Sequence, residues 1–69
     1  MQTRTSKKQM HEANEVLRSI YPNDMVYAAG EYNASEKAYI RHNGIVTEYK
    51  NNSEAFEAAT EIIFEADEI

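Results

Sequence analysis

The fold is decided by residues 37–49, which read KAYIRHNGIVTEY and place two alternating runs on either side of Asn43-Gly44. A two-residue type I′ turn needs positive φ at both central positions, and Asn-Gly adopts that conformation at little cost. We therefore predict a tight β-hairpin in which His42 lies opposite Ile45 and Ala38 lies opposite Tyr49. Because side chains alternate along a strand, one face of this hairpin is the candidate core, and it holds Ala38, Ile40, His42, Ile45, Thr47 and Tyr49.

The segments around the hairpin complete a small α+β pattern. Residues 6–21 carry apolar side chains every third or fourth position and are followed by Pro22, which predicts a helix. Residues 25–32 are rich in β-branched, aromatic and small side chains and predict a first strand. A second helix begins at residues 51–53, where Asn and Ser offer capping oxygens. The predicted fold is one domain over residues 1–69, in which both helices cover one face of a three-stranded antiparallel meander and residues 1–5 form a flexible arm.

Length and composition narrow the functions that this chain can have. A domain of 69 residues buries only about 60% of the surface of its unfolded chain, which leaves little room for a pocket. The chain has no cysteine, no glycine-rich phosphate loop and no serine in a nucleophile motif. We therefore expect a protein that is not an enzyme and that has no metal and no cofactor. The polar N-terminus and the lack of a long apolar run favour a cytoplasmic protein without a membrane segment.

The charge of −5 is concentrated in residues 51–69, which hold six acids and no base. At 100° per residue, five of these acids fall within an arc of about 80°, nearly opposite an apolar stripe. The stripe consists of Ala55, Phe56, Ala59, Ile62, Ile63 and Ala66. We call the five acids the acidic ridge, and its members are Glu54, Glu57, Glu61, Glu65 and Glu68. Phe64 lies beside this ridge and away from the stripe.

The acidic ridge is open to two interpretations, a solvated helix face or a recognition surface for a basic partner. Like charges three or four residues apart destabilise a helix by roughly 0.2–0.5 kcal/mol per pair, and acids near a helix C-terminus oppose its dipole. Solubility alone does not require these costs, which favours recognition. The ridge places about one charge per 5 Å, whereas a DNA strand places one phosphate per about 3.4 Å. By itself, the ridge is therefore too sparse to imitate DNA.

The second candidate surface is the face of the hairpin that points away from the core. On that face lie Tyr39, Arg41, Val46 and Glu48. The first strand adds one of two pairs of side chains to it, either Tyr27 and Ala29 or Val26 and Ala28. Exposed tyrosine and arginine beside an apolar residue favour a protein-binding or homodimer patch. The alternative is that these cross-strand neighbours only stabilise a thin sheet.

The order of elements over residues 6–67 resembles that of double-stranded-RNA-binding domains. In that family, a lysine cluster at the start of the last helix grips phosphates, and the loop between the first two strands enters the minor groove. The matching helix start here, Asn51-Asn52-Ser53-Glu54-Ala55, has no lysine, and the matching loop is residues 31–37. The resemblance implies an alternative function, nucleic-acid binding through the bases Lys7, Lys8, Arg18 and Arg41.

The leading hypothesis is a non-enzymatic interaction module that binds a basic surface of another protein. A small acidic domain of this kind is typical of a phage or mobile-element inhibitor of a nucleic-acid-handling host protein. The negative charge disfavours direct binding to nucleic acid. A homodimer built on the tyrosine-bearing face is a further alternative. The predicted partner-binding residues are Tyr39, Arg41, Glu54, Glu57, Glu61, Phe64, Glu65 and Glu68.

Overall fold

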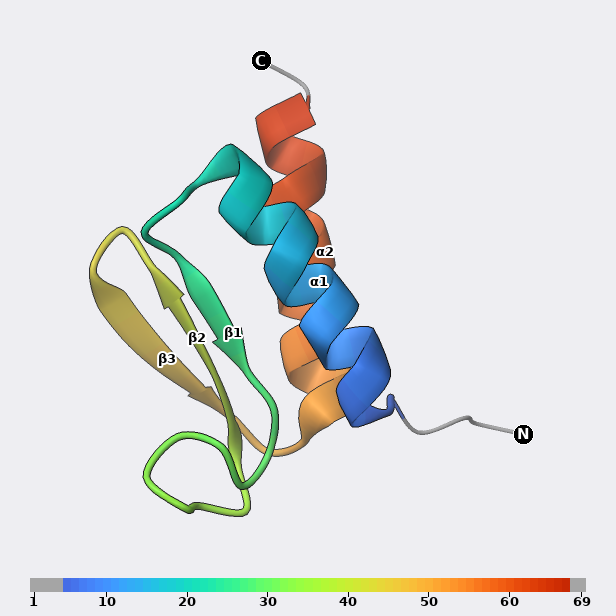
Figure 1. Cartoon of the computed structure of the whole chain (residues 1–69), viewed down its shortest axis with the longest axis vertical. Coiled ribbons are helices and arrows are strands. Elements are labelled where there is room, and N and C mark those ends of the chain that lie inside the picture. Colours follow the sequence, from blue (N-terminus) through green and yellow to red (C-terminus); the bar gives the residue numbers. More distant parts are fainter. Residues whose placement is uncertain (1–4, 68–69) are drawn as a thin grey trace.

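The computed structural model describes residues 5–67, which form two helices and a three-stranded sheet. The elements are α1 (Lys7–Ile20), β1 (Met25–Tyr27), β2 (Ala38–His42), β3 (Ile45–Tyr49) and α2 (Asn52–Asp67). The strands pair antiparallel in the order β1-β2-β3, and the helices run side by side along one face of the sheet with their N-termini at the same end (Figure 1). This arrangement confirms the predicted α+β fold. Neither helix within the described residues is long and apolar enough to cross a membrane.

The predicted hairpin and its register are confirmed residue by residue. His42 pairs with Ile45, Ile40 with Thr47, and Ala38 with Tyr49. The φ angles of Asn43 and Gly44 are 55° and 80°, the left-handed values that a type I′ turn requires. The dipeptide Asn-Gly therefore fixes which side chains of β2 and β3 share a face.

Both helices begin at capped ends, and the cap of α2 lies in the predicted segment 51–53. The Ser6 side chain accepts a hydrogen bond from the Gln9 N–H, and the Gln9 side chain accepts one from the Ser6 N–H, which together form a capping box. Asn51 caps α2, since its Oδ1 accepts a hydrogen bond of 2.9 Å from the Glu54 N–H. Thr5 lies within the arm predicted for residues 1–5, and it contacts Ser53 in the first turn of α2. The rest of that arm, residues 1–4, lies outside the described residues.

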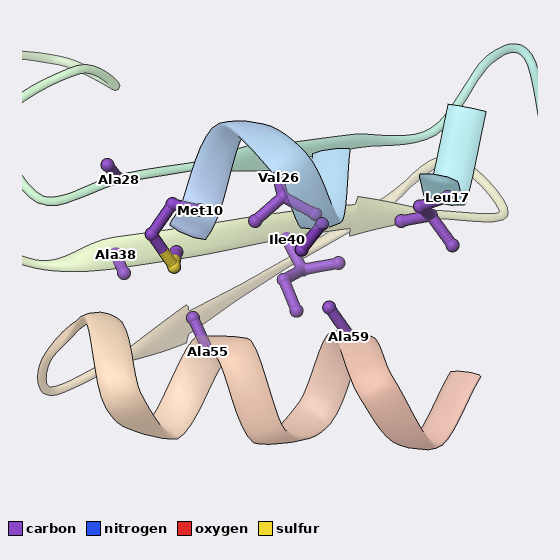
Figure 2. Packing of buried hydrophobic residues seen from close by; sticks show 9 residues of the cluster. Met10, Leu17, Val26, Ala28, Ala38, Ile40, Ala55 and Ala59 are labelled. Atoms are coloured by element: carbon purple, nitrogen blue, oxygen red, sulfur yellow. The ribbon is translucent and has the colours of Figure 1, made fainter. Parts of the chain in front are cut away.

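The core lies between the helix pair and the near face of the sheet (Figure 2). Its nine buried side chains are Met10, Ala13, Leu17, Val26, Ala28, Ala38, Ile40, Ala55 and Ala59. Three of them come from α1 and two from α2, so each helix contributes the stripe that its apolar spacing predicts. Phe56, Ile62 and Ile63 pack around this centre as half-buried neighbours.

The predicted core face of the hairpin is only partly covered, which corrects the sequence expectation. Ala38 and Ile40 are buried, but Ile45 is 67% exposed and Thr47 is exposed as well. The turn end of the hairpin diverges from the helices (Figure 1). Register decides which face a side chain points to, and the length and tilt of the covering helices decide whether that face is buried.

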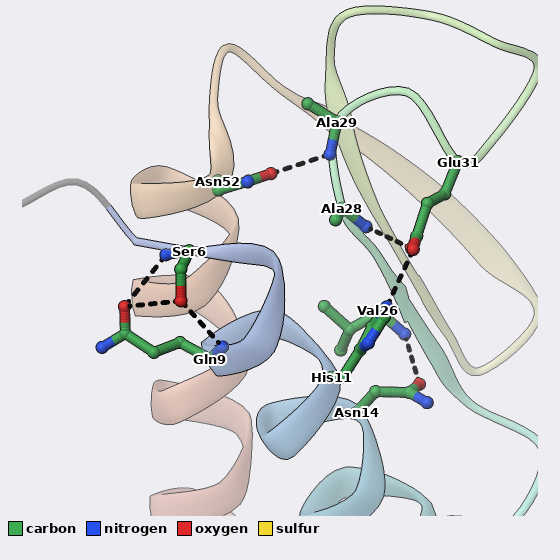
Figure 3. A network of polar contacts seen from close by, with 9 residues as sticks. All are labelled: Ser6, Gln9, His11, Asn14, Val26, Ala28, Ala29, Glu31 and Asn52. Atoms are coloured by element: carbon green, nitrogen blue, oxygen red, sulfur yellow. Dashed lines mark hydrogen bonds and ion pairs between the residues drawn. The ribbon is translucent and has the colours of Figure 1, made fainter.

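The first strand is shorter than predicted, because it ends at Tyr27 and not at residue 32. Beyond Tyr27, side chains replace a neighbouring strand as hydrogen-bond partners. The Ala28 N–H donates to Glu31 at 3.0 Å, and the Ala29 N–H donates to Asn52 at 2.8 Å (Figure 3). Gly30 follows with a φ of 89°, which turns the chain out of the extended conformation.

Candidate protein-interaction site

The acidic ridge lies on the exposed side of α2, as its helical spacing predicts. Glu54, Glu57, Glu61 and Glu65 are all exposed, while Ala55 and Ala59 on the opposite side are buried. Glu68 lies outside the described residues. The Glu54 carboxylate accepts a hydrogen bond of 3.3 Å from the Lys50 N–H, which ties the start of the ridge to the end of β3. The ridge therefore begins where the sheet meets the second helix.

The other three described carboxylates of the ridge have no ion-pair partner among residues 5–67. Among residues 5–67, the ion pairs join His11 to Glu31, Lys37 to Glu48 and His42 to Asp24, and none of them involves the ridge. The last turn of α2 has no basic residue that would complement the helix dipole. Phe64 is 63% exposed beside these charges. The surface therefore combines unpaired negative charge with one large apolar side chain, a combination found at protein-binding sites.

Tyr39 and Arg41 lie on the opposite layer of the molecule from the ridge. They alternate along β2 with the buried Ala38 and Ile40, and so they point away from the helices. Arg41 donates from Nε to the Asn23 carbonyl oxygen at 3.3 Å. The seven predicted binding residues that the structure describes therefore belong to two separate surfaces. Of the two aromatic residues among them, Phe64 shares the helix layer with the ridge and Tyr39 does not.

The outer sheet face is a cluster of tyrosines that partly cover one another. The β1–β2 register places Met25 opposite Arg41 and Tyr27 opposite Tyr39, so Tyr27 belongs to the outer face while Val26 is buried. Tyr32 packs between the two other tyrosines, with ring centroids 4.8 Å from each. These three rings are half-buried against one another, so they expose less apolar area on the predicted binding face than separate tyrosines would. This finding gives weight to a stabilising role for this face.

A buried carboxylate next to a histidine is the main polar feature that the sequence analysis missed. Asp24 is only 4% exposed, and its Oδ2 contacts His42 Nδ1 while its Oδ1 accepts from the Asn43 N–H at 3.4 Å. Tyr21 packs edge-on against the His42 ring with centroids 5.1 Å apart. The β1–β2 register would have revealed the pair, since Asp24 precedes the Met25–Arg41 pair and therefore lies beside His42.

The Asp24–His42 pair joins the segment between α1 and β1 to the end of β2, and its geometry is not that of a catalytic triad. Asp24 lines an open depression of about 620 Å³ together with Arg41, Asn43 and Gly44. A triad needs a nucleophile at the free nitrogen of the histidine, whereas His42 Nε2 has the Asn43 side-chain amide 3.4 Å away. The pair therefore fastens the hairpin turn to the segment between α1 and β1.

A second polar network joins α1 to the loop after β1. His11 Nε2 lies 2.8 Å from Glu31 Oε1, and Glu31 Oε2 accepts from the Ala28 N–H (Figure 3). The hydrogen bond with His11 lowers the pKa of the Glu31 carboxyl below its usual 4.5, the Ala28 N–H adds to this effect, and partial burial opposes it. Nearby, the Asn14 side chain accepts a hydrogen bond of 2.9 Å from the Val26 N–H. These contacts hold α1 against β1.

The lowered pKa of Glu31 predicts a specific dependence of stability on pH. A carboxyl whose pKa is lower in the folded state contributes stability above its unfolded value of 4.5, and this contribution is lost as pH falls through the folded pKa. We therefore expect Glu31→Gln to make the free energy of unfolding less sensitive to acid below pH 4.5. Urea unfolding at a series of pH values measures this, with Glu36→Gln in the same loop as the matched control, because the Glu36 side chain forms none of the hydrogen bonds or ion pairs found among residues 5–67, whereas Glu31 binds His11 and the Ala28 N–H. Equal acid sensitivity of wild type and Glu31→Gln would contradict the assignment.

The bases of the alternative nucleic-acid hypothesis do not form one patch. Lys7, Lys8 and Arg18 are exposed on α1, which covers the inner face of the sheet, whereas Arg41 lies on the outer face. Lys7 and Arg18 are eleven residues apart on one helix, a rise of about 16 Å. Phosphate binding depends on several bases acting at one surface, and this arrangement separates them.

Comparison with known proteins adds no functional assignment. No family model, no curated protein and no solved structure matches this chain.

Proposed function

We propose that this protein is a non-enzymatic interaction module that binds a basic surface of another protein through the acidic ridge of α2. The observation that supports this proposal is the set of exposed ridge carboxylates, Glu57, Glu61 and Glu65, without an ion pair to any described residue. Within the free domain, these like charges oppose helix formation. A basic partner would neutralise them and would be attracted from a distance, which raises the association rate.

Proteins that handle nucleic acids are the partner class that we propose. Such proteins gain affinity from clustered lysine and arginine side chains, and those clusters match the ridge in charge. An acidic domain bound there would compete with the nucleic acid for the same surface. This competition would give the module an inhibitory role, as expected of a phage or mobile-element inhibitor.

Reversing two charges of the ridge tests the proposed function. We expect the double substitution Glu61→Lys, Glu65→Lys to weaken binding to a partner captured with the wild-type protein and then purified, by at least about tenfold. The fold should persist, because lysine near the end of α2 complements the helix dipole and removes like-charge pairs. Calorimetric titration measures the affinity, and circular dichroism checks the helix content.

The matched control is the double substitution Glu12→Lys, Glu15→Lys on α1. Both residues are exposed on a helix, and this variant has the same net charge as the ridge variant. We expect it to retain most of the affinity, apart from a slower association that follows net charge. Equal losses of affinity in the two variants would mean that net charge, and not the ridge, determines binding. Wild-type affinity in the ridge variant would disprove the proposal.

A further inference from the structure

The sheet has one covered edge and one open edge. At the β1 edge, the Val26 N–H points away from β2 and donates to the Asn14 side chain of α1. Just beyond the strand, the N–H groups of Ala28 and Ala29 donate to the side chains of Glu31 and Asn52 (Figure 3). At the opposite edge lies β3, and no side chain among residues 5–67 hydrogen-bonds to the backbone of Ile45–Tyr49. The asymmetry leaves a single five-residue edge of the sheet unpaired in the described part of the chain.

The hairpin turn determines which groups of β3 face outward. In a two-residue hairpin, the residues that flank the turn, here His42 and Ile45, exchange hydrogen bonds with each other. Thr47 and Tyr49 then also bond to β2, because bonding alternates along the strand. The N–H and C=O groups of Val46 and Glu48 therefore point away from the sheet. These two residues offer the donors and acceptors that an added strand needs.

The sequence of β3 gives this edge little protection. Natural edge strands are protected by proline, by a bulge or by charged side chains, and the single charge of β3, Glu48, is paired with Lys37. This strand is Ile-Val-Thr-Glu-Tyr with an unbroken register, and three of its residues are β-branched. Ile45, on its inner face, is 67% exposed. The strand is thus suited to pairing and has an apolar side chain that a fourth strand would cover.

The negative charge near the β3 edge indicates which kind of segment could pair with it. Helix α2 packs against β3 from the inner side, and Glu54 at the start of the ridge binds the Lys50 N–H directly after the strand. An added strand would run beside β3 on the flank of α2 that is turned away from α1, where the acidic ridge begins. A second copy of this chain would bring two acidic ridges toward each other, whereas a lysine- or arginine-bearing segment would complement them.

We propose that β3 binds an extended basic segment of the partner protein as a fourth, antiparallel strand. Lysine or arginine would occupy the alternate positions that face α2, and backbone hydrogen bonds would form with Val46 and Glu48. This inference rests on the proposed function and specifies how the partner is recognised. It also explains how a small domain could combine affinity, from the backbone pairing, with selectivity, from the ridge.

A synthetic peptide of alternating lysine and threonine, about ten residues long, is the probe for this mode of binding. The control peptide alternates lysine and glycine, and so it keeps the charges and their spacing but forms strands poorly. We expect the threonine peptide to bind more tightly. In wild-type protein, its binding should slow amide exchange at Val46 and Glu48 by at least about tenfold, while Thr47, which already bonds to β2, changes little.

Substitution at the edge separates strand addition from charge attraction. Val46→Pro removes one outward N–H without breaking the hydrogen bonds between β2 and β3, and Val46→Ala shortens the same side chain while keeping the N–H. We expect at least about tenfold weaker binding of the threonine peptide to Val46→Pro than to Val46→Ala. The protection of Val46 and Glu48 in wild-type protein needs no variant, so it tests the inference even if proline disturbs the fold.

The possible outcomes distinguish this inference from the proposed function. If the ridge variant Glu61→Lys, Glu65→Lys loses binding while Val46→Pro retains it, the ridge is the site and strand addition is wrong. If Val46→Pro loses binding and the ridge variant retains it, the edge pairs with segments regardless of charge, which overturns the basic occupant. Failure of both peptides to bind at low salt would overturn strand addition alone, because the proposed function is decided separately by the ridge variant and the purified partner.

Discussion

Replacing Ile40 by alanine is expected to lower the free energy of unfolding by about 3 kcal/mol. Ile40 is 1% exposed and lies on the central strand among the other buried side chains of the core (Figure 2). A domain of this length has a total stability of about 3–10 kcal/mol. The substitution should therefore remove about a third or more of the total stability. Urea unfolding followed by circular dichroism gives the midpoint and the slope from which the change is calculated.

Ile45→Ala is the matched control for this prediction. Ile45 is the same residue type on the same face of the same hairpin, but it is 67% exposed. We expect a change within about 0.5 kcal/mol, as for most surface substitutions. A loss at Ile45 as large as the loss at Ile40 would mean that the hairpin end is covered in solution, either by the helices or by a second copy. Sedimentation at several protein concentrations would then tell these two cases apart.

The isoleucine pair also marks the limit of what the sequence predicts about this fold. Asn43-Gly44 fixes the hairpin register through a local backbone requirement, and Ser6 and Asn51 mark the helix starts through local hydrogen bonds. Local chemistry of this kind can be recognised in a single sequence. Whether Ile45 is buried depends instead on the tilt of the hairpin relative to helices that are distant in sequence, and no local pattern specifies that tilt.

The same distinction explains the candidate site. The exposure of Glu57, Glu61 and Glu65 follows from helical periodicity, which the sequence displays directly. The open edge of β3 could not be recognised as readily, because all three strands were predicted but the protection of one edge by Asn14 was not. That protection depends on where α1 lies across β1. A surface defined by one element is therefore predictable here, whereas a surface defined by the relation between elements requires the structure.

The second large effect is expected at Asp24, where alanine should cost about 2 kcal/mol. Asp24 is a buried carboxylate. One of its oxygens contacts the His42 ring, and the other accepts a hydrogen bond from the Asn43 N–H. Removing it leaves these groups without their partner in a site that is largely closed to water, and the cost of such unpaired groups exceeds the net gain of a single surface hydrogen bond. The contact also fastens the segment before β1 to the hairpin turn, so its loss should loosen both.

A double-mutant cycle measures how much of this cost belongs to the contact itself. The four proteins are wild type, Asp24→Ala, His42→Ala and the variant with both substitutions, and we expect a coupling energy of about 1 kcal/mol or more. Asp24→Asn serves as a further control, because its side chain keeps an oxygen for the Asn43 N–H and should cost less than alanine. If Asp24→Ala is equally costly with and without His42, the coupling is zero and the carboxylate acts through the turn backbone alone. The hairpin would then be anchored by Asn43, and His42 would only shield that anchor from water.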